Sequence, residues 1–300
     1  MTTQSLVETA TISLFGEVLF DCFTDEQAKE TKVLGGAPFN ICWHLQALGD
    51  NPNFISRVGK DELGQQILKQ SQAWGINVDN IQLDNKHSTG QVNVEVINNE
   101  PHYDIRENSA YDYIQADLVK LSEINKKGIL YHGSLALRSD SAKQEFNELL
   151  NKGSWSLFLD VNLRAPWWQF HSLETWLRQA RWVKLNIDEL AELGFDINNL
   201  EAAMLKFQQT YQNEQVIVTL GADGVKVLSE GVFYSEKPQT IESFIDTVGA
   251  GDAFTAIYMH GLMHEWPIQK NLAMAQRFAS KIIGIQGGTP KSQTFYSEFC

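Results

Sequence analysis

Short apolar runs alternate with helical patterns along most of this chain. Buried strands are expected at residues 10–16, 53–58, 129–132, 156–161, 181–185 and 216–220. Apolar residues recur with helical spacing at 37–48, 61–74, 116–125, 142–151, 173–178 and 200–211. Strands that are apolar on both faces and separated by helices are typical of a parallel sheet covered on both sides. We therefore expect a three-layer α/β/α fold with a mainly parallel central sheet.

The end of the chain is mostly helical, at 250–264 and 268–284. Two segments, 17–34 and 89–106, are polar-alternating and do not follow the strand and helix alternation. They could pair as a small sheet standing away from the core, like a lid, or form two ordinary surface hairpins. Because no repeat or low-complexity linker divides the chain, we expect a single domain over 1–300 that includes this β lid.

Composition excludes several classes of function. The chain has 300 residues, 43% of them hydrophobic, which is ample for a large core. Its formal net charge is -13 and no Lys/Arg cluster stands out, so nucleic acid is not an expected partner. No run reaches the ~18 apolar residues of a membrane span. Cys22, Cys42 and Cys300 are odd in number and lack CxxC spacing, which indicates free thiols and a cytoplasmic protein.

The segment 246–254, Asp-Thr-Val-Gly-Ala-Gly-Asp-Ala-Phe, joins a small-residue turn to an apolar helix. The first N–H groups of a helix have no internal partner, and a turn of Gly249, Ala250 and Gly251 lets an anion approach them closely. Asp252 would stand beside that anion. A carboxylate is useful there if it takes a proton from a hydroxyl while the anion is transferred. The alternative is an ordinary loop with Asp252 as a helix cap.

Other glycine-containing segments indicate which type of phosphate-binding site the chain has. The chain contains no G-x-x-x-x-G-K-[ST] and no G-x-G-x-x-G after a strand, so a P-loop and a dinucleotide fingerprint are both absent. Instead, residues 35–40 open the first helix, 221–224 follow a predicted strand and 287–290 follow the last helix. In order and spacing these segments, together with 246–254, resemble the ribokinase-like (pfkB-type) carbohydrate kinases over 16–290.

The resemblance implies an ATP-dependent kinase that phosphorylates a primary hydroxyl of a small sugar. Asp252 would be the catalytic base, and the N–H groups of Gly249, Ala250 and Gly251 would hold the transferring phosphoryl group. The sugar would be bound by a set of residues from both halves of the chain: Asp21, Gly35, Gly36, Asn40, Arg106 and Arg164. For Asn40, the alternative is a solvent-facing position on the first helix.

The nucleotide side follows from the same resemblance. Asn186 and Glu189 match an Asn-x-x-Glu element near the phosphates and Mg²⁺, although the same spacing also makes a helix capping box. The nucleotide-side turns would be formed by four further residues: Thr219, Gly221, Gly224 and Gly287. Asp246, with Val248, lies where a K⁺ ion would be held. Gln276 stands where the family often has Asn near the adenine.

The choice of sugar also rests on resemblance. Residues 160–168, Asp-Val-Asn-Leu-Arg-Ala-Pro-Trp-Trp, are similar to a stretch in fructokinases and 2-keto-3-deoxygluconate kinases. Residues 16–21 and 184–190 favour fructokinase, whereas the Arg106 region also suits a keto-deoxy acid. Arg164 could orient a phosphate or a substrate acid, or pair with Asp160. Fructose is the expected substrate, with 2-keto-3-deoxygluconate, another ribokinase-like substrate or a non-catalytic sugar sensor as alternatives.

The two polar-alternating segments allow a second interpretation. Besides forming a lid over one active site, they could pair between two subunits. We therefore expect a homodimer through the lid.

Overall fold

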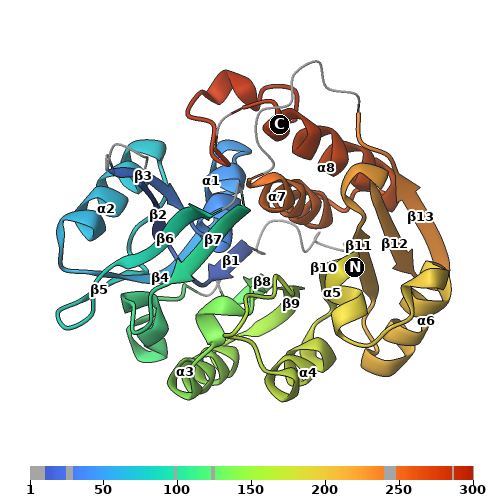
Figure 1. Cartoon of the computed structure of the whole chain (residues 1–300), viewed down its shortest axis with the longest axis horizontal. Helices are drawn as coiled ribbons and strands as arrows, with labels where there is room; N and C mark the ends of the chain where they lie inside the picture. The colour runs from blue at the N-terminus through green and yellow to red at the C-terminus, as the bar shows by residue number, and fades with distance from the viewer. Residues whose placement is uncertain are drawn as a thin grey trace, which may run out of the picture.

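A nine-stranded sheet forms the centre of the computed structural model (Figure 1), which describes residues 11–24, 30–97, 100–122, 126–239, 248–285 and 287–299. The strand order is β13-β12-β11-β10-β9-β8-β1-β4-β5. All pairs from β11 to β5 are parallel, and β12 and β13 add an antiparallel edge. The strands are β1 (Thr11–Phe15), β4 (Asn53–Gly59), β5 (Ile81–Asp84), β8 (Lys127–His132), β9 (Ser154–Asp160), β10 (Trp182–Asn186), β11 (Gln215–Thr219), β12 (Val225–Ser229) and β13 (Val232–Glu236).

Helices cover both faces of this sheet (Figure 1). One face carries α1 (Ala37–Ala47), α2 (Glu62–Trp74), α7 (Ala250–Met263) and α8 (Ile268–Ile283). The other carries α3 (Asp140–Leu150), α4 (Phe170–Gln179), α5 (Ile187–Glu192) and α6 (Leu200–Tyr211). Neighbouring strand residues serve opposite layers: Leu14 packs in the core under the first group of helices and Phe15 in the core under the second. The expected three-layer α/β/α fold is confirmed.

Local sequence signals mark the helix ends as expected. Pro38 lies in the first turn of α1, and Gly49 follows that helix at φ 88°. In α2 the side chain of Asp61 accepts a hydrogen bond from the N–H of Gly64, and Gly75 ends the helix in the left-handed conformation. None of the helices in the described part of the chain is both long and apolar enough to cross a bilayer.

The two polar-alternating segments pair with each other. They form a separate four-stranded sheet in the order β3 (Glu30–Gly35), β2 (Leu19–Thr24), β6 (Gly90–Ile97) and β7 (Glu100–Ile105). Alternate residues of β2 serve its two faces: Phe20 and Cys22 join the hydrophobic core, whereas Asp21 faces away from it. The segments therefore do not form two independent surface hairpins, which was the alternative prediction.

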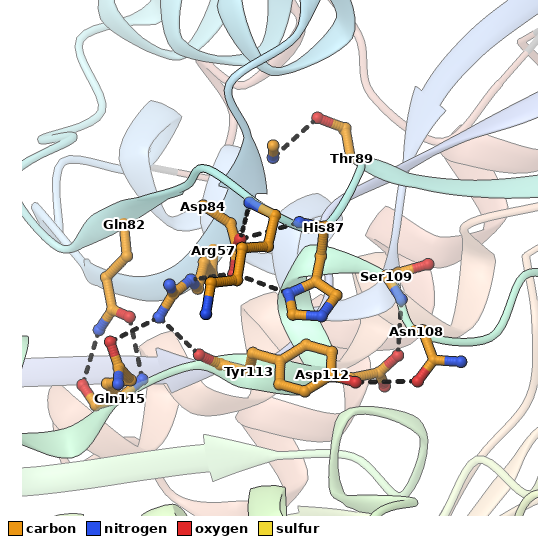
Figure 2. A network of polar contacts seen from close by, with 12 residues as sticks. Arg57, Gln82, Asp84, His87, Thr89, Asn108, Ser109, Asp112, Tyr113 and Gln115 are labelled. Carbon is orange, nitrogen blue, oxygen red and sulfur yellow. Dashed lines mark hydrogen bonds and ion pairs between the residues drawn. The ribbon is translucent and has the colours of Figure 1, made fainter.

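A polar network ties this small sheet to the edge of the main one (Figure 2). Arg57 of β4 forms an ion pair with Asp84 at the end of β5, with 2.8 Å between Nε and Oδ2. It also donates to the carbonyl of Tyr113, in the segment that follows β7. Asp84 accepts hydrogen bonds from the backbone N–H groups of Lys86 and His87, just before β6. The segments entering β6 and leaving β7 are thus held to the same strand pair.

The prediction of one helix, at 116–125, is wrong. Residues 116–122 form only a short 3-10 turn, at Ala116–Leu118, and residues 123–125 lie outside the described part of the chain. The side chain of Asn80 bonds both the N–H and the carbonyl of Lys120, and Glu145 accepts from the N–H of Ala116. Asn80 thus engages the N–H and carbonyl of Lys120, which a helix over this segment would pair internally. The remaining 3-10 turns are Ala110–Tyr113, Leu135–Leu137, Ile197–Asn199, Gly221–Asp223 and Gln293–Phe295.

Candidate active site

A cavity of about 890 Å³ opens at the carboxyl ends of the parallel strands, the edge at which open α/β sheets bind ligands. Strands β9, β10 and β11, the small sheet and the first turns of α1 and α7 all contribute to its wall. The cavity brings together ten of the residues expected at the site: Asp21, Gly36, Asn40, Arg164, Asn186, Glu189, Thr219, Gly249, Gly251 and Asp252. Residues more than two hundred positions apart thus share one pocket.

Asp252 lies in the first turn of α7, and its carboxylate meets α1. Its Oδ2 accepts a hydrogen bond of 2.8 Å from Nδ2 of Asn40. The N-cap of α7 is Gly249, at φ 80°, and no side chain caps the helix. Asp252 is therefore not a helix cap, and Asn40 is buried rather than solvent-facing. Burial raises the pKa of Asp252 to about 6, against the lowering effect of the Asn40 hydrogen bond.

The turn before Asp252 touches the turn that follows α8. A Cβ placed on Gly249 would come within 2.5 Å of the Cα of Gly288, so only glycine allows this approach. Gly251 is exposed and lines the cavity, whereas Ala250 and Gly287 do not line the cavity. The free N–H groups at the start of α7 therefore border an open space.

A buried ion pair lies beside that turn. Lys184 Nζ is 2.7 Å from Asp160 Oδ2, and the hydroxyl of Thr255 on α7 also donates to that oxygen at 3.3 Å. Burial alone would lower the pKa of Lys184, but the Asp160 carboxylate outweighs it and the pKa is raised. Both side chains line the cavity. Lys184 thus supplies a cation next to Gly251, a role that was not predicted from the sequence.

Asn186 and Glu189 form a complete capping box at the start of α5. Asn186 accepts from the N–H of Glu189, and Glu189 Oε2 accepts from the N–H of Asn186. Oε1 of Glu189 accepts a further hydrogen bond of 2.7 Å from the N–H of Leu163. Burial raises the pKa of Glu189. Since both residues also line the cavity, the capping role and a ligand-binding role are compatible.

Glu17, directly beyond β1, is a second residue that our sequence analysis passed over. It is 3% exposed, lines the cavity, and its Oε2 has no hydrogen-bond partner among the described residues. Burial raises the pKa of Glu17 to about 7. Asp21 lies four residues further on, in β2, and burial raises its pKa to about 6. Gly35 leaves room for it, because a Cβ there would lie 3.1 Å from Asp21 Oδ2.

The two arginines differ in position. Arg164 lies exposed at the cavity wall and donates to the carbonyl of Leu163, and it takes part in none of the ion pairs between described residues. Pairing with Asp160 is therefore absent, because that carboxylate binds Lys184. Arg106 is exposed just after β7 and does not line the cavity.

Two further expected positions do not line the cavity, and a third lies outside the described residues. Gly221 and Gly224 form the turn after Thr219 without lining the cavity. Asp246 lies outside the described residues.

Comparison with known proteins identifies the family. The model of the pfkB family of carbohydrate kinases matches residues 9–294. This chain belongs to that family. As a pfkB-family carbohydrate kinase it is a sugar phosphotransferase.

Relatives of this pfkB kinase include proteins with different sugar substrates in their names. The chain is 26% identical to a fructokinase of Salmonella typhimurium over 258 residues, 82% of each protein. It is 25% identical to a 5-dehydro-2-deoxygluconokinase of Clostridium beijerinckii over 281 residues, 86% of this chain and 80% of that one. Among solved structures, the fructokinase of Xylella fastidiosa with bound ATP aligns with a TM-score of 0.83 at 20% identity, covering 97% of this chain and 99% of the other.

Proposed function

We propose that this kinase transfers the γ-phosphoryl group of ATP to a primary hydroxyl of a small sugar, with fructose as the preferred acceptor. The observation that carries the proposal is the Asp252 carboxylate, half-buried in the first turn of α7 and held by a hydrogen bond from Asn40. Asp252 accepts the hydroxyl proton as the sugar oxygen attacks the γ-phosphorus. The bond to the β-phosphate oxygen breaks, and ADP leaves.

The phosphate side of the cavity provides charge stabilisation. The N–H groups of Gly249, Ala250 and Gly251 donate to the transferring group, and the Lys184 ammonium offsets its negative charge. The nucleotide lies along the turns that follow β11 and α8, at Thr219, Gly221, Gly224 and Gly287.

Two cations complete this proposal. Glu189 would hold Mg²⁺ with Asn186, because its carboxylate keeps unused lone pairs beyond the two backbone hydrogen bonds it accepts. A Mg²⁺ ion held there would supply charge neutralisation for the phosphates. Asp246 is the proposed ligand of a K⁺ ion. The free thiols of Cys22 and Cys42 support a reducing, cytoplasmic setting for the reaction.

The sugar side is formed by the small sheet and the start of α1. Asp21 can accept hydrogen bonds from two neighbouring hydroxyls, and Glu17 Oε2 is a buried acceptor without a partner among the described residues. Gly35 and Gly36 keep space open beside them, and Asn40 orients the base. These groups suit a neutral, hydroxyl-rich substrate.

A keto-deoxy sugar acid is the alternative substrate. Arg164 supports it, because this exposed guanidinium at the cavity wall has no carboxylate partner among the described residues. A substrate carboxylate would match its planar fork, and Arg106 could assist from the nearby end of β7. The relative named 5-dehydro-2-deoxygluconokinase is consistent with such a substrate.

The test is coupled ADP release with Mg-ATP and fructose, 2-keto-3-deoxygluconate, ribose or adenosine as acceptor. We expect the highest kcat/KM with fructose. Highest turnover on the keto-deoxy acid, together with a loss confined to that substrate in an Arg164→Ala variant, would replace fructose by the alternative. Sugar binding without turnover on any acceptor would contradict the kinase assignment and favour a sugar sensor.

A further inference from the structure

Three potential metal ligands meet on the side of the molecule away from the catalytic turn. His260 and His264 are four residues apart, at the C-terminal end of α7, so both imidazoles lie on one face of the helix. Asp50 approaches them from the connection between α1 and β4. Nδ1 of His260 is 2.8 Å from Asp50 Oδ2, and Nε2 of His264 is 3.3 Å from Asp50 Oδ1.

The separations between these nitrogen and oxygen atoms are close to those between the ligand atoms of a tetrahedral metal site. One ligand atom from each residue lies within 4.8 Å of the others. Bonds of about 2.0–2.1 Å from Zn²⁺ to imidazole nitrogen and carboxylate oxygen place tetrahedral ligands roughly 3.3 Å apart. Small side-chain rotations would therefore open the existing cluster enough to admit an ion.

The surroundings favour a cation. The side chains of Asp50 and His260 are 7% and 6% exposed, while that of His264 is 47% exposed, so the cluster is walled on one side and open to solvent on the other. The carbonyl end of α7 also favours positive charge. Trp266 packs edge-on against the His260 ring, with 5.1 Å between centroids, and limits the movement of that ligand.

We propose that Asp50, His260 and His264 bind a late first-row divalent metal ion, with Zn²⁺ as the representative and water as the fourth ligand. Two neutral imidazoles and one carboxylate suit Zn²⁺, Co²⁺ or Ni²⁺ better than Mg²⁺, which prefers oxygen ligands. The ion would join the far ends of α1 and α7, which pack against each other (Figure 1). The near ends of the same two helices carry Asn40 and Asp252, so the site would brace the helix pair that holds the base.

The experiment uses the full chain, freed of metal with EDTA and dialysed without nucleotide. In a calorimetric titration, one equivalent of Zn²⁺ per chain should bind at this cluster. Co²⁺ bound there should show the visible absorption of tetrahedral coordination. We expect His264→Ala to weaken Zn²⁺ binding by at least about 100-fold, since loss of an outer-shell partner alone costs about 10- to 100-fold. Asp50→Asn should have a similar effect, and Zn²⁺ should raise the Tm of the wild type but not of these two variants.

His171→Ala is the matched control, because His171 is exposed on α4 and belongs to no cluster of potential metal ligands among the described residues. It should bind Zn²⁺ as the wild type does. Equal binding by the wild type and His264→Ala would overturn the proposal, and so would tetrahedral Co²⁺ absorption that survives both cluster variants. His264 is exposed, so its replacement should leave the fold intact, which circular dichroism checks.

Discussion

At the scale of single residues, Asp252 combines a fixed orientation with an unfavourable environment for charge. Removing the carboxylate while keeping its shape, as Asp252→Asn, should lower kcat by about 10²–10⁴, the usual contribution of a general base. Sugar affinity should change little, because Asn40 can still bond the amide. Steady-state kinetics and sugar titration measure both quantities, with exposed Asp79→Asn as the control. An undiminished kcat would rule out Asp252 as the base.

Glu17 provides a pH-dependent prediction about stability. Its pKa is about 7 in the folded chain against 4.5 as the ordinary value, so the folded state binds the proton more tightly. Stability therefore falls as the pH rises from 4.5 through 7, by about 2–3 kcal/mol between pH 5 and pH 8. Glu17→Gln lacks this loss, and its unfolding free energy relative to wild type should improve by that amount over the interval.

Urea denaturation at the two pH values measures the Glu17 effect. The other buried acids remain in both proteins, so their contributions cancel in the comparison. A constant difference between variant and wild type would show that Glu17 does not titrate in this range.

At the scale of elements, the contact between the turn before α7 and the turn after α8 carries a steric prediction. Gly249→Ala adds a Cβ that meets the Cα of Gly288 at 2.5 Å, so the two turns must separate. Gly231→Ala, in the β12–β13 hairpin, has a similar positive φ but nothing within 4 Å. Both variants should lose about 1–3 kcal/mol through backbone strain. Only Gly249→Ala should also lose kcat, and equal kcat in the two would contradict the role of this turn.

The spacing of apolar residues predicts the helices and strands that carry a regular apolar pattern of their own. Most strands and helices of the main layers are found with ends shifted by a few residues. The helix expected at 116–125 is not found, because the side chain of Asn80, distant in sequence, binds both backbone groups of Lys120. The edge strand β5, Ile81–Asp84, was not predicted: it is four residues long, and its Leu83 is exposed.

The site could be predicted only in part for a related reason. The glycine turns and Asp252 stand in a recognisable motif, whereas Lys184 and Glu17 look like ordinary residues at strand ends. Only the register of β9 and β10 shows that Lys184 lies opposite Asp160. Likewise, Glu17 is buried only in the folded chain, where the turn before α1 packs against its backbone.

At the scale of the whole molecule, the small sheet should also form the contact between subunits. Phe23 and Val33, on neighbouring strands, are each 39% exposed. A second copy of the sheet could cover them, so light scattering should give a dimer mass for the wild type. Val33→Asp should give a monomer, while Val232→Asp, at an exposed position on the far edge of the main sheet, should not. A monomeric wild type would reject the dimer.

The hydrogen bond between Asn40 and Asp252 joins positions 212 residues apart. During synthesis the strands of the first two hundred residues emerge before α7 and α8, which cover one face of their sheet. The growing chain therefore holds an incomplete apolar layer until the last fifth of the message is translated, and Asn40 meets Asp252 only then. Because exposed apolar surface favours aggregation, the arrival of the last two long helices both completes the core and protects the nascent chain.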